Sequence, residues 1–263
     1  MSRSLIGDYI DSFRNPDFWT YSTWLELVTR YRRSRLGLFW ALMPSLLYMF
    51  CLGGFFSYVQ GLDLRIFIPH LGIGYVIFRL ITISLSECAT SLPGHASFIL
   101  DGRVRLTDYV LRVVAKALFF FAMSFPALLI AVYISPNFQW HGLLLSLPAF
   151  MLVMLNIGWM GAIGAVLGAR LQDVHELIGS ILMFSFLFTP IIWTADQAPP
   201  DTLRGGIARL NPLFHMVESV RAPLLGEQLA TSSWIYLGVM LVGGWLAAAF
   251  VYRRYARFVP VWV

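Results

Sequence analysis

The side chains that could do chemistry gather in two short groups with helical spacing. The members are His215, Glu218 and Arg221 in the first group, and Arg170, Asp173, His175 and Glu176 in the second. Imidazoles and carboxylates serve as metal ligands and as catalytic acids or bases. The same spacing also pairs charges along one helix face. We interpret both groups as structural networks at helix surfaces, in preference to metal or catalytic sites.

Motifs of known membrane chemistry are missing. The sequence has no H-E-x-x-H, no Gly-x-Ser-Gly and no Asp-x-Asp, so nothing indicates an enzyme. A P-loop needs glycines beside a lysine, but the only lysine, Lys116, has no glycine nearby. The chain is therefore no P-loop ATPase. Cys51 and Cys88 both lie in apolar segments and predict neither a disulfide framework nor a metal cluster.

Arg79 is the one cation that falls deep within an apolar segment. An unpaired charge at that depth costs about 3 kcal/mol or more, so Arg79 should face a cavity or a partner instead of lipid. It could contact an anionic group such as a pyrophosphate. It could equally pair with Glu87 or extend toward the membrane surface.

Composition identifies the environment. Of 263 residues, 58% are hydrophobic and only 13% charged, about half the charged share of a soluble domain. Residues 36–62, 117–169, 177–195 and 228–252 contain no Asp, Glu, Lys or Arg, and such helices can cross about 30 Å of hydrocarbon. The sequence therefore predicts an all-α integral membrane protein.

We predict six transmembrane helices, because Ser135-Pro136-Asn137 divides the longest apolar stretch. The spans are about 36–60, 66–90, 109–134, 142–169, 175–195 and 231–252. With cytoplasmic termini, fourteen cations fall inside and four outside, as the positive-inside rule favours. The same rule explains the basic net charge better than nucleic-acid binding.

Three further segments have distinct patterns. Residues 17–35 predict an amphipathic interface helix, with a simple basic flank as the alternative. Residues 91–108 form a cytoplasmic loop with a short helix before Asp101, which could dock a partner or merely connect spans. Residues 196–230 are too apolar for a free loop, so we expect short helices that re-enter the membrane or lie on its outer face. Gly164 and Gly168 form a G-x-x-x-G that allows close helix packing.

Aromatic residues are distributed along the first span. Those that could line a passage are Trp40, Tyr48, Phe55, Phe56 and Tyr58. Because sugar rings stack on aromatic faces, such a passage would suit a sliding glycan, whereas interface anchoring explains the terminal residues.

The layout resembles type 2 ABC exporter permeases for bacterial polysaccharides of the O-antigen and capsular type. The most specific match is the R-Y-R-x-S-x-L-G-x-x-W-A stretch that begins at Arg30. Residues 211–218, Asn-Pro-Leu-Phe-His-Met-Val-Glu, resemble the N-P-L-x-H-x-V-E of these families, and Pro190-Ile191-Ile192-Trp193 is a looser match. The likeness covers nearly the whole chain.

The resemblance implies a homodimer in the bacterial inner membrane, joined by two copies of a separate ABC ATPase subunit that binds ATP and Mg. This chain would hold no cofactor of its own. The substrate would be a lipid-linked polysaccharide, whose anionic lipid end and sugars would meet gate residues Arg30, Tyr31, Arg32, Arg33, Arg35, the first-span aromatics and Arg79. Coupling to the ATPase would involve Phe98, Ile99, Leu100, Asp101, Gly102 and Arg103. The outer re-entrant segment would include Asn211, Pro212, His215 and Glu218.

Three other functions remain open. An ABC permease for a drug or small lipid would share the topology but need fewer aromatics. A membrane-embedded glycolipid-processing enzyme would need paired acids or a nucleophile facing a cavity. A non-transporting scaffold subunit would tolerate neutralisation of the arginines from Arg30 to Arg35.

Overall fold

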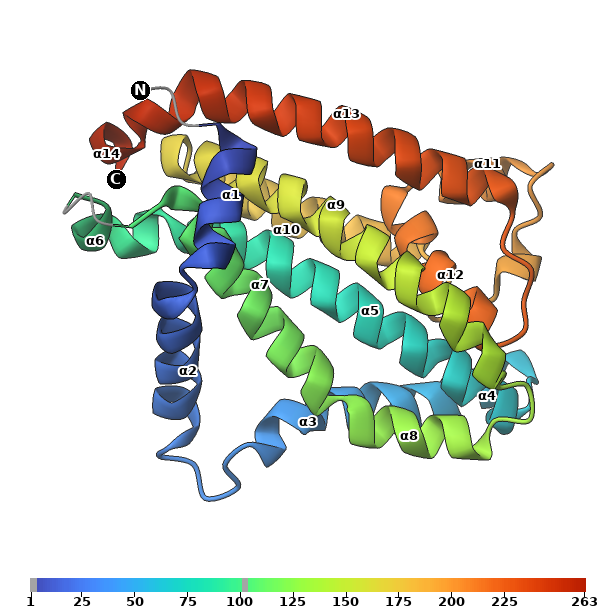
Figure 1. Cartoon of the computed structure of the whole chain (residues 1–263). Coiled ribbons are helices and arrows are strands. Elements are labelled where there is room, and N and C mark those ends of the chain that lie inside the picture. Colours follow the sequence, from blue (N-terminus) through green and yellow to red (C-terminus); the bar gives the residue numbers. More distant parts are fainter. Residues whose placement is uncertain (1–3, 101–103) are drawn as a thin grey trace.

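A computed structural model describes residues 4–100 and 104–263, and every regular element in these ranges is helical. The helices are α1 (Leu5–Arg14), α2 (Asp17–Tyr31), α3 (Phe39–Leu46), α4 (Gly53–Gln60), α5 (Leu64–Ser91), α6 (Ala96–Leu100), α7 (Leu106–Met123), α8 (Phe125–Ile134), α9 (Leu143–Arg170), α10 (Asp173–Phe188), α11 (Leu203–Leu210), α12 (Pro212–Leu224), α13 (Thr231–Tyr255) and α14 (Val259–Trp262). Short helices α1, α6 and α14 lie at one end of the bundle, called the terminal end, and α11 and α12 lie toward the distal end (Figure 1).

Within residues 4–100 and 104–263, four helical stretches are long and apolar enough to cross a membrane, or five if one bent pair is a single span. They are Phe39–Gln60, Leu64–Ser91, Trp140–Arg170 and Thr231–Trp262, and the bent pair is α7 with α8. The pair bends by 42° beside Ser124, where Pro126 follows. The remaining predicted span, 175–195, overlaps the 16-residue α10, which is shorter than the about 20 residues that a span needs. The six-span count stays a prediction.

Helix α5 forms the centre of the molecule. It packs against α4, α7, α8, α9, α10 and α12, and 78% of its most apolar window is buried. The first span is different, because only 22% of its window is buried. One broad side of the first span is thus left for lipid or for another subunit.

The first span is not a uniform α-helix. Between α3 and α4, residues Leu47–Leu52 form a π-helix, shortly after Pro44. Proline removes one backbone hydrogen bond from a helix, and π-helical turns recur at functional sites. Tyr48 lies in this widened turn.

The interface helix predicted at 17–35 corresponds to α2, which runs steeply across the long helices (Figure 1). Its apolar side chains Tyr21, Trp24, Leu25 and Val28 are exposed, which suits a helix lying against a membrane surface. Helix α1 was not predicted. It packs on α7 and α13, with hydrogen bonds from Tyr9 to the Gly158 carbonyl and from Tyr252 to Asp8.

The short helix expected at residues 97–100 is α6, Ala96–Leu100. The segment 196–230 contains α11 and α12, and α12 is buried over most of its length. Short helices in this segment are therefore confirmed, whereas its placement relative to a membrane remains a prediction.

Candidate functional site

A hollow of about 410 Å³ lies between the π-helical turn, α5 and α10. The rings of Tyr48 and Tyr75 stack on its border, with centroids 4.0 Å apart and planes 10° apart. Arg79 and Thr82 border it from the next turns of α5. Phe186 closes it from α10. An arginine thus stands beside stacked aromatic rings in a half-enclosed space within the apolar part of the chain.

Arg79 is held by neutral groups. Its Nη1 donates to Ser45 Oγ at 3.2 Å and lies 3.5 Å from the Ala41 carbonyl oxygen. The Ser45 hydroxyl is itself 2.7 Å from that of Ser124. The ion pairs within 4–100 and 104–263 do not include Arg79. Its positive charge is thus available to an anion in the hollow.

The predicted alternative that Arg79 pairs with Glu87 is wrong. Glu87 instead forms an ion pair with Lys116 of α7. Glu87 and Lys116 face each other across the contact between α5 and α7. The Lys116 ammonium group, and not the Arg79 guanidinium, is therefore the positive charge beside Glu87.

One phenylalanine connects Arg79 to the basic stretch that begins at the end of α2. The guanidinium carbon of Arg79 lies 5.5 Å from the centroid of Phe120, and that of Arg30 lies 5.9 Å from the same centroid. Both distances are in the range of cation–π attraction. The predicted gate residue Arg30 and the predicted deep cation Arg79 therefore share one ring.

The other predicted substrate residues lie apart from this hollow. Arg32, Arg33 and Arg35 are exposed after α2, and Tyr31 is half-buried beside the Phe120 cluster. Among the first-span aromatics, Tyr48 alone borders the hollow. The others point elsewhere: Trp40, Phe55 and Tyr58 are exposed, and Phe56 packs edge-on against Phe55.

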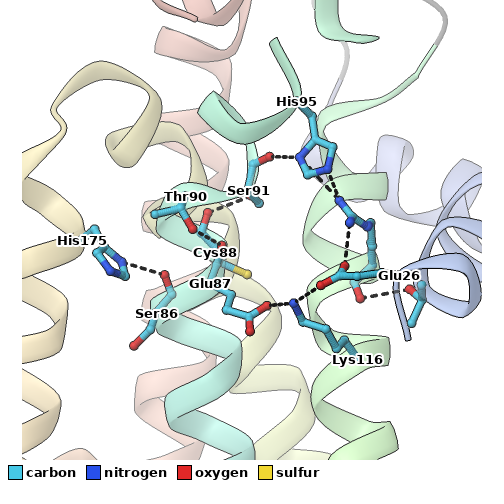
Figure 2. A network of polar contacts seen from close by, with 11 residues as sticks. Glu26, Ser86, Glu87, Cys88, Thr90, Ser91, His95, Lys116 and His175 are labelled. Carbon is cyan, nitrogen blue, oxygen red and sulfur yellow. Dashed lines mark hydrogen bonds and ion pairs between the residues drawn. The ribbon is translucent and has the colours of Figure 1, made fainter. Parts of the chain in front are cut away.

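A polar network at the terminal end joins four segments (Figure 2). Glu26 of α2 accepts hydrogen bonds from Arg112 at 2.6 Å and from Lys116 at 2.7 Å. Lys116 also pairs with Glu87 of α5, and Arg112 contacts His95, whose Nδ1 lies 2.8 Å from the Ser91 carbonyl oxygen. Two carboxylates and two cations thus tie α2, α5, α7 and the segment before α6 together. No sequence pattern predicted this network, and the single lysine, Lys116, was its one signal in the sequence.

Electrostatics in the network follow from partial burial. For Glu26, burial acts to raise the pKa, but the hydrogen bonds and charges of Lys116 and Arg112 outweigh it and hold the pKa below its ordinary value. For His95, burial and then the charge of Arg112 lower the pKa, despite the hydrogen bond to Ser91. At neutral pH the carboxylate is charged and the imidazole neutral.

The residues predicted to couple to an ATPase lie beside this network. In α6, Phe98 and Leu100 are 53% and 62% exposed, whereas Ile99 is buried. Phe98 touches Phe18 of α2 edge-on. The predicted residues Asp101, Gly102 and Arg103 lie outside the described residues.

The predicted stripe of His215, Glu218 and Arg221 in α12 is buried and does not lie at a helix surface. Glu218 and Arg221 interact with each other, whereas His215 has other partners. Arg221 is 0% exposed and pairs with Glu218. It also donates to the Pro190 carbonyl and contacts His70. The polar stripe faces the core because α5 and the Pro190 turn supply its remaining partners.

Asn211 and His215 fix the start of α12. His215 lies 2.9 Å from Ser233 Oγ and 2.8 Å from the Arg209 carbonyl oxygen. Asn211 caps α12 through Leu213 N, with Pro212 in the first turn. These interactions explain the predicted re-entrant residues as structural ones.

The second predicted group is arranged differently from the expectation. The guanidinium carbon of Arg170 lies 5.3 Å from the ring centroid of Tyr255 and 5.6 Å from that of Trp262. Arg170 thus connects the C-terminal residues to α9 and does not pair with Asp173 or Glu176. His175 lies 3.2 Å from the Ser86 carbonyl oxygen. No cluster of three or more metal-ligating side chains occurs within the described parts of the chain.

Comparison with known proteins decides the class of protein. The profile of the ABC-2 type transporter family matches residues 18–225, more than half of the chain. The chain belongs to the ABC-2 type transporter family. It is therefore a multi-pass membrane subunit of a transporter, as the resemblance implied, and a non-catalytic role is consistent with that family. No curated protein gave a significant match.

Proposed function

We propose that this ABC-2 permease exports a lipid-linked polysaccharide of the O-antigen or capsular type across the bacterial inner membrane. The observation that carries the proposal is the line from Arg30 through Phe120 to Arg79 and the stacked tyrosines. Guanidinium groups suit an anionic phosphate or pyrophosphate. Aromatic faces suit sugar rings. A substrate with both parts, an anionic lipid end and a glycan, matches this order of side chains.

The energy source is a separate ABC ATPase, because the chain has no P-loop of its own. Two copies of that ATPase, with ATP and Mg, would serve two copies of the permease. The exposed apolar pair Phe98 and Leu100 in α6 supports docking at this point. The first span, little buried within one subunit, supports a homodimer in which Trp40 and Tyr58 face a second copy. In this arrangement both termini are cytoplasmic.

The proposal is tested by deleting the gene in its native host and measuring surface glycan and intracellular lipid-linked glycan. We expect surface glycan to disappear while lipid-linked glycan accumulates inside, and the plasmid-borne gene should restore export. A variant with Arg30, Arg32, Arg33 and Arg35 replaced by glutamine should insert but fail to export.

The same experiment separates the alternatives. A permease for a drug or small lipid leaves surface glycan normal after deletion and changes drug sensitivity or lipid distribution. A scaffold subunit leaves export intact in the arginine variant. A glycolipid-processing enzyme changes the structure of the glycan without trapping it inside. Each of these results contradicts polysaccharide export.

A further inference from the structure

A second hollow, of about 640 Å³, lies toward the distal end of the bundle. Its walls come from the start of α5, the connection before α11, α12, and the connection between α12 and α13. It shares no lining residue with the hollow beside Arg79. Its volume is in the range of small-ligand sites in proteins.

The lining combines an apolar floor with a polar rim. Phe67 and Phe214 border the hollow and are 1% and 5% exposed, so they belong to the core beneath it. Asp196, Gln228 and Ser232 are exposed at its border. Carboxylates and amides exchange hydrogen bonds with hydroxyl groups, while apolar walls accept the C–H faces of a sugar ring.

The charge of the hollow disfavours an anion. Its lining contains four carboxylates, of which Glu218 is already paired with Arg221. Asp63, Asp196 and Glu227 remain against the single lining arginine, Arg209.

Arg209 is turned toward protein groups. It donates to the carbonyls of Ala198 at 2.9 Å and Gly205 at 3.1 Å, and it lies over the Phe214 ring. Burial raises the pKa of Glu227; the charge of Arg221 opposes this shift, and the smaller effects of Glu218 and Asp196 add to it. A phosphate would meet repulsion here, whereas hydroxyl groups would find acceptors. A metal ion fits less well, since the described residues contain no cluster of three metal ligands.

We propose that this distal hollow binds uncharged, hydroxyl-rich sugar units of the exported glycan. The inference rests on the proposed function. It adds that the lipid end and the sugar chain of the substrate bind in two different hollows. The anionic lipid end is received beside Arg79, and the sugar chain is received among Asp196, Glu227 and Gln228.

Site-specific photo-crosslinking in exporting cells tests this inference. The photoreactive residue p-benzoylphenylalanine replaces Gln228 at the rim, and in a matched control it replaces Asp201, which is exposed in the same outer segment but does not line the hollow. We expect irradiation to attach glycan to the permease at position 228 at least fivefold more than at position 201. Equal capture at both positions, or capture at neither, overturns the inference.

A second experiment measures surface glycan in variants of the residues that line the hollow. We expect the double variant Glu227→Gln with Gln228→Ala to lower surface glycan two- to fivefold, and Asp201→Asn to leave it unchanged. Wild-type export by the double variant contradicts a sugar site. This failure is distinguishable from failure of the proposed function, in which deletion of the whole gene leaves surface glycan intact.

Discussion

The ammonium group of Lys116 lies 2.7 Å from a carboxylate oxygen of Glu26. This contact joins α7 to the interface helix α2, and the same ammonium pairs with Glu87 on the central α5. The Lys116 side chain is only 10% exposed, and a buried charge is tolerated only when it is paired. The single lysine of the chain therefore holds the interface helix to the core.

We predict that Lys116→Met destabilises the folded permease by about 1–3 kcal/mol. Breaking a fully buried ion pair costs about 3–5 kcal/mol, and the loss is smaller here because the two carboxylates are 31% and 35% exposed. Thermal unfolding in detergent, followed by tryptophan fluorescence, measures the effect. Arg254→Met, which removes an exposed cation, is the control. Equal melting temperatures of the two variants would contradict the role of Lys116.

The second prediction concerns pH. The pKa of His95 is lowered in the folded protein, chiefly by burial and then by Arg112, so the unfolded chain binds more protons as pH falls below the ordinary value of about 6.5. The contribution of neutral His95 to stability is thus complete above that pH and declines below it. Between pH 7.5 and pH 5.5 the wild-type melting temperature should fall more than that of His95→Gln. Parallel curves would show that this imidazole does not contribute.

Arg79 provides a prediction about transport. Arg79→Ala should lower glycan export at least tenfold, because the hollow loses its countercharge for the anionic end of the substrate. Arg79→Lys should retain part of the export, since it keeps the charge but not the planar fork. Copurification with the ATPase checks that the complex is intact. Normal surface glycan in Arg79→Ala would remove this residue from the substrate path.

The buried pair of Arg221 and Glu218 predicts an effect on stability. Arg221→Met leaves Glu218 uncompensated in the core, and we expect a loss of about 3–5 kcal/mol. The double variant Arg221→Met with Glu218→Met should unfold at a higher temperature than the single variant, because no lone charge remains. If the single and double variants have the same melting temperature, the pair is not coupled.

The spans could be predicted from the sequence because membrane crossing depends on local composition. The first, second, fourth and last predicted spans match apolar helices to within a few residues at most boundaries. The second of these spans contains the polar residues His70, Arg79 and Glu87. It is nevertheless the most buried span, since partners on other helices satisfy all three side chains.

The sites were predictable only in part, because their partners are distant in sequence. Arg79 could be identified as a deep cation, yet its relation to Arg30 depends on Phe120 from a third helix. The link between Glu26 and Lys116 spans 90 positions, and neither residue has a local pattern that indicates it. Helix α1 was missed because its buried face includes the polar residues Asp8 and Ser12, which weaken the apolar periodicity.

The G-x-x-x-G of α9 leads to the last prediction. The two glycines are not equivalent, because a Cβ on Gly168 would overlap the backbone carbonyl of Ala89 on α5, whereas a Cβ on Gly164 would make only ordinary contact with Ile178 at 3.7 Å. Gly168→Ala must therefore separate α9 from α5, and we expect a loss of about 1–3 kcal/mol. Gly164→Ala should be neutral or stabilising by up to about 1 kcal/mol, since alanine favours helix. Thermal unfolding of the two variants compares one added methyl group at two positions of the same helix. A similar response of both would mean that close contact between α5 and α9 does not limit the stability of the bundle.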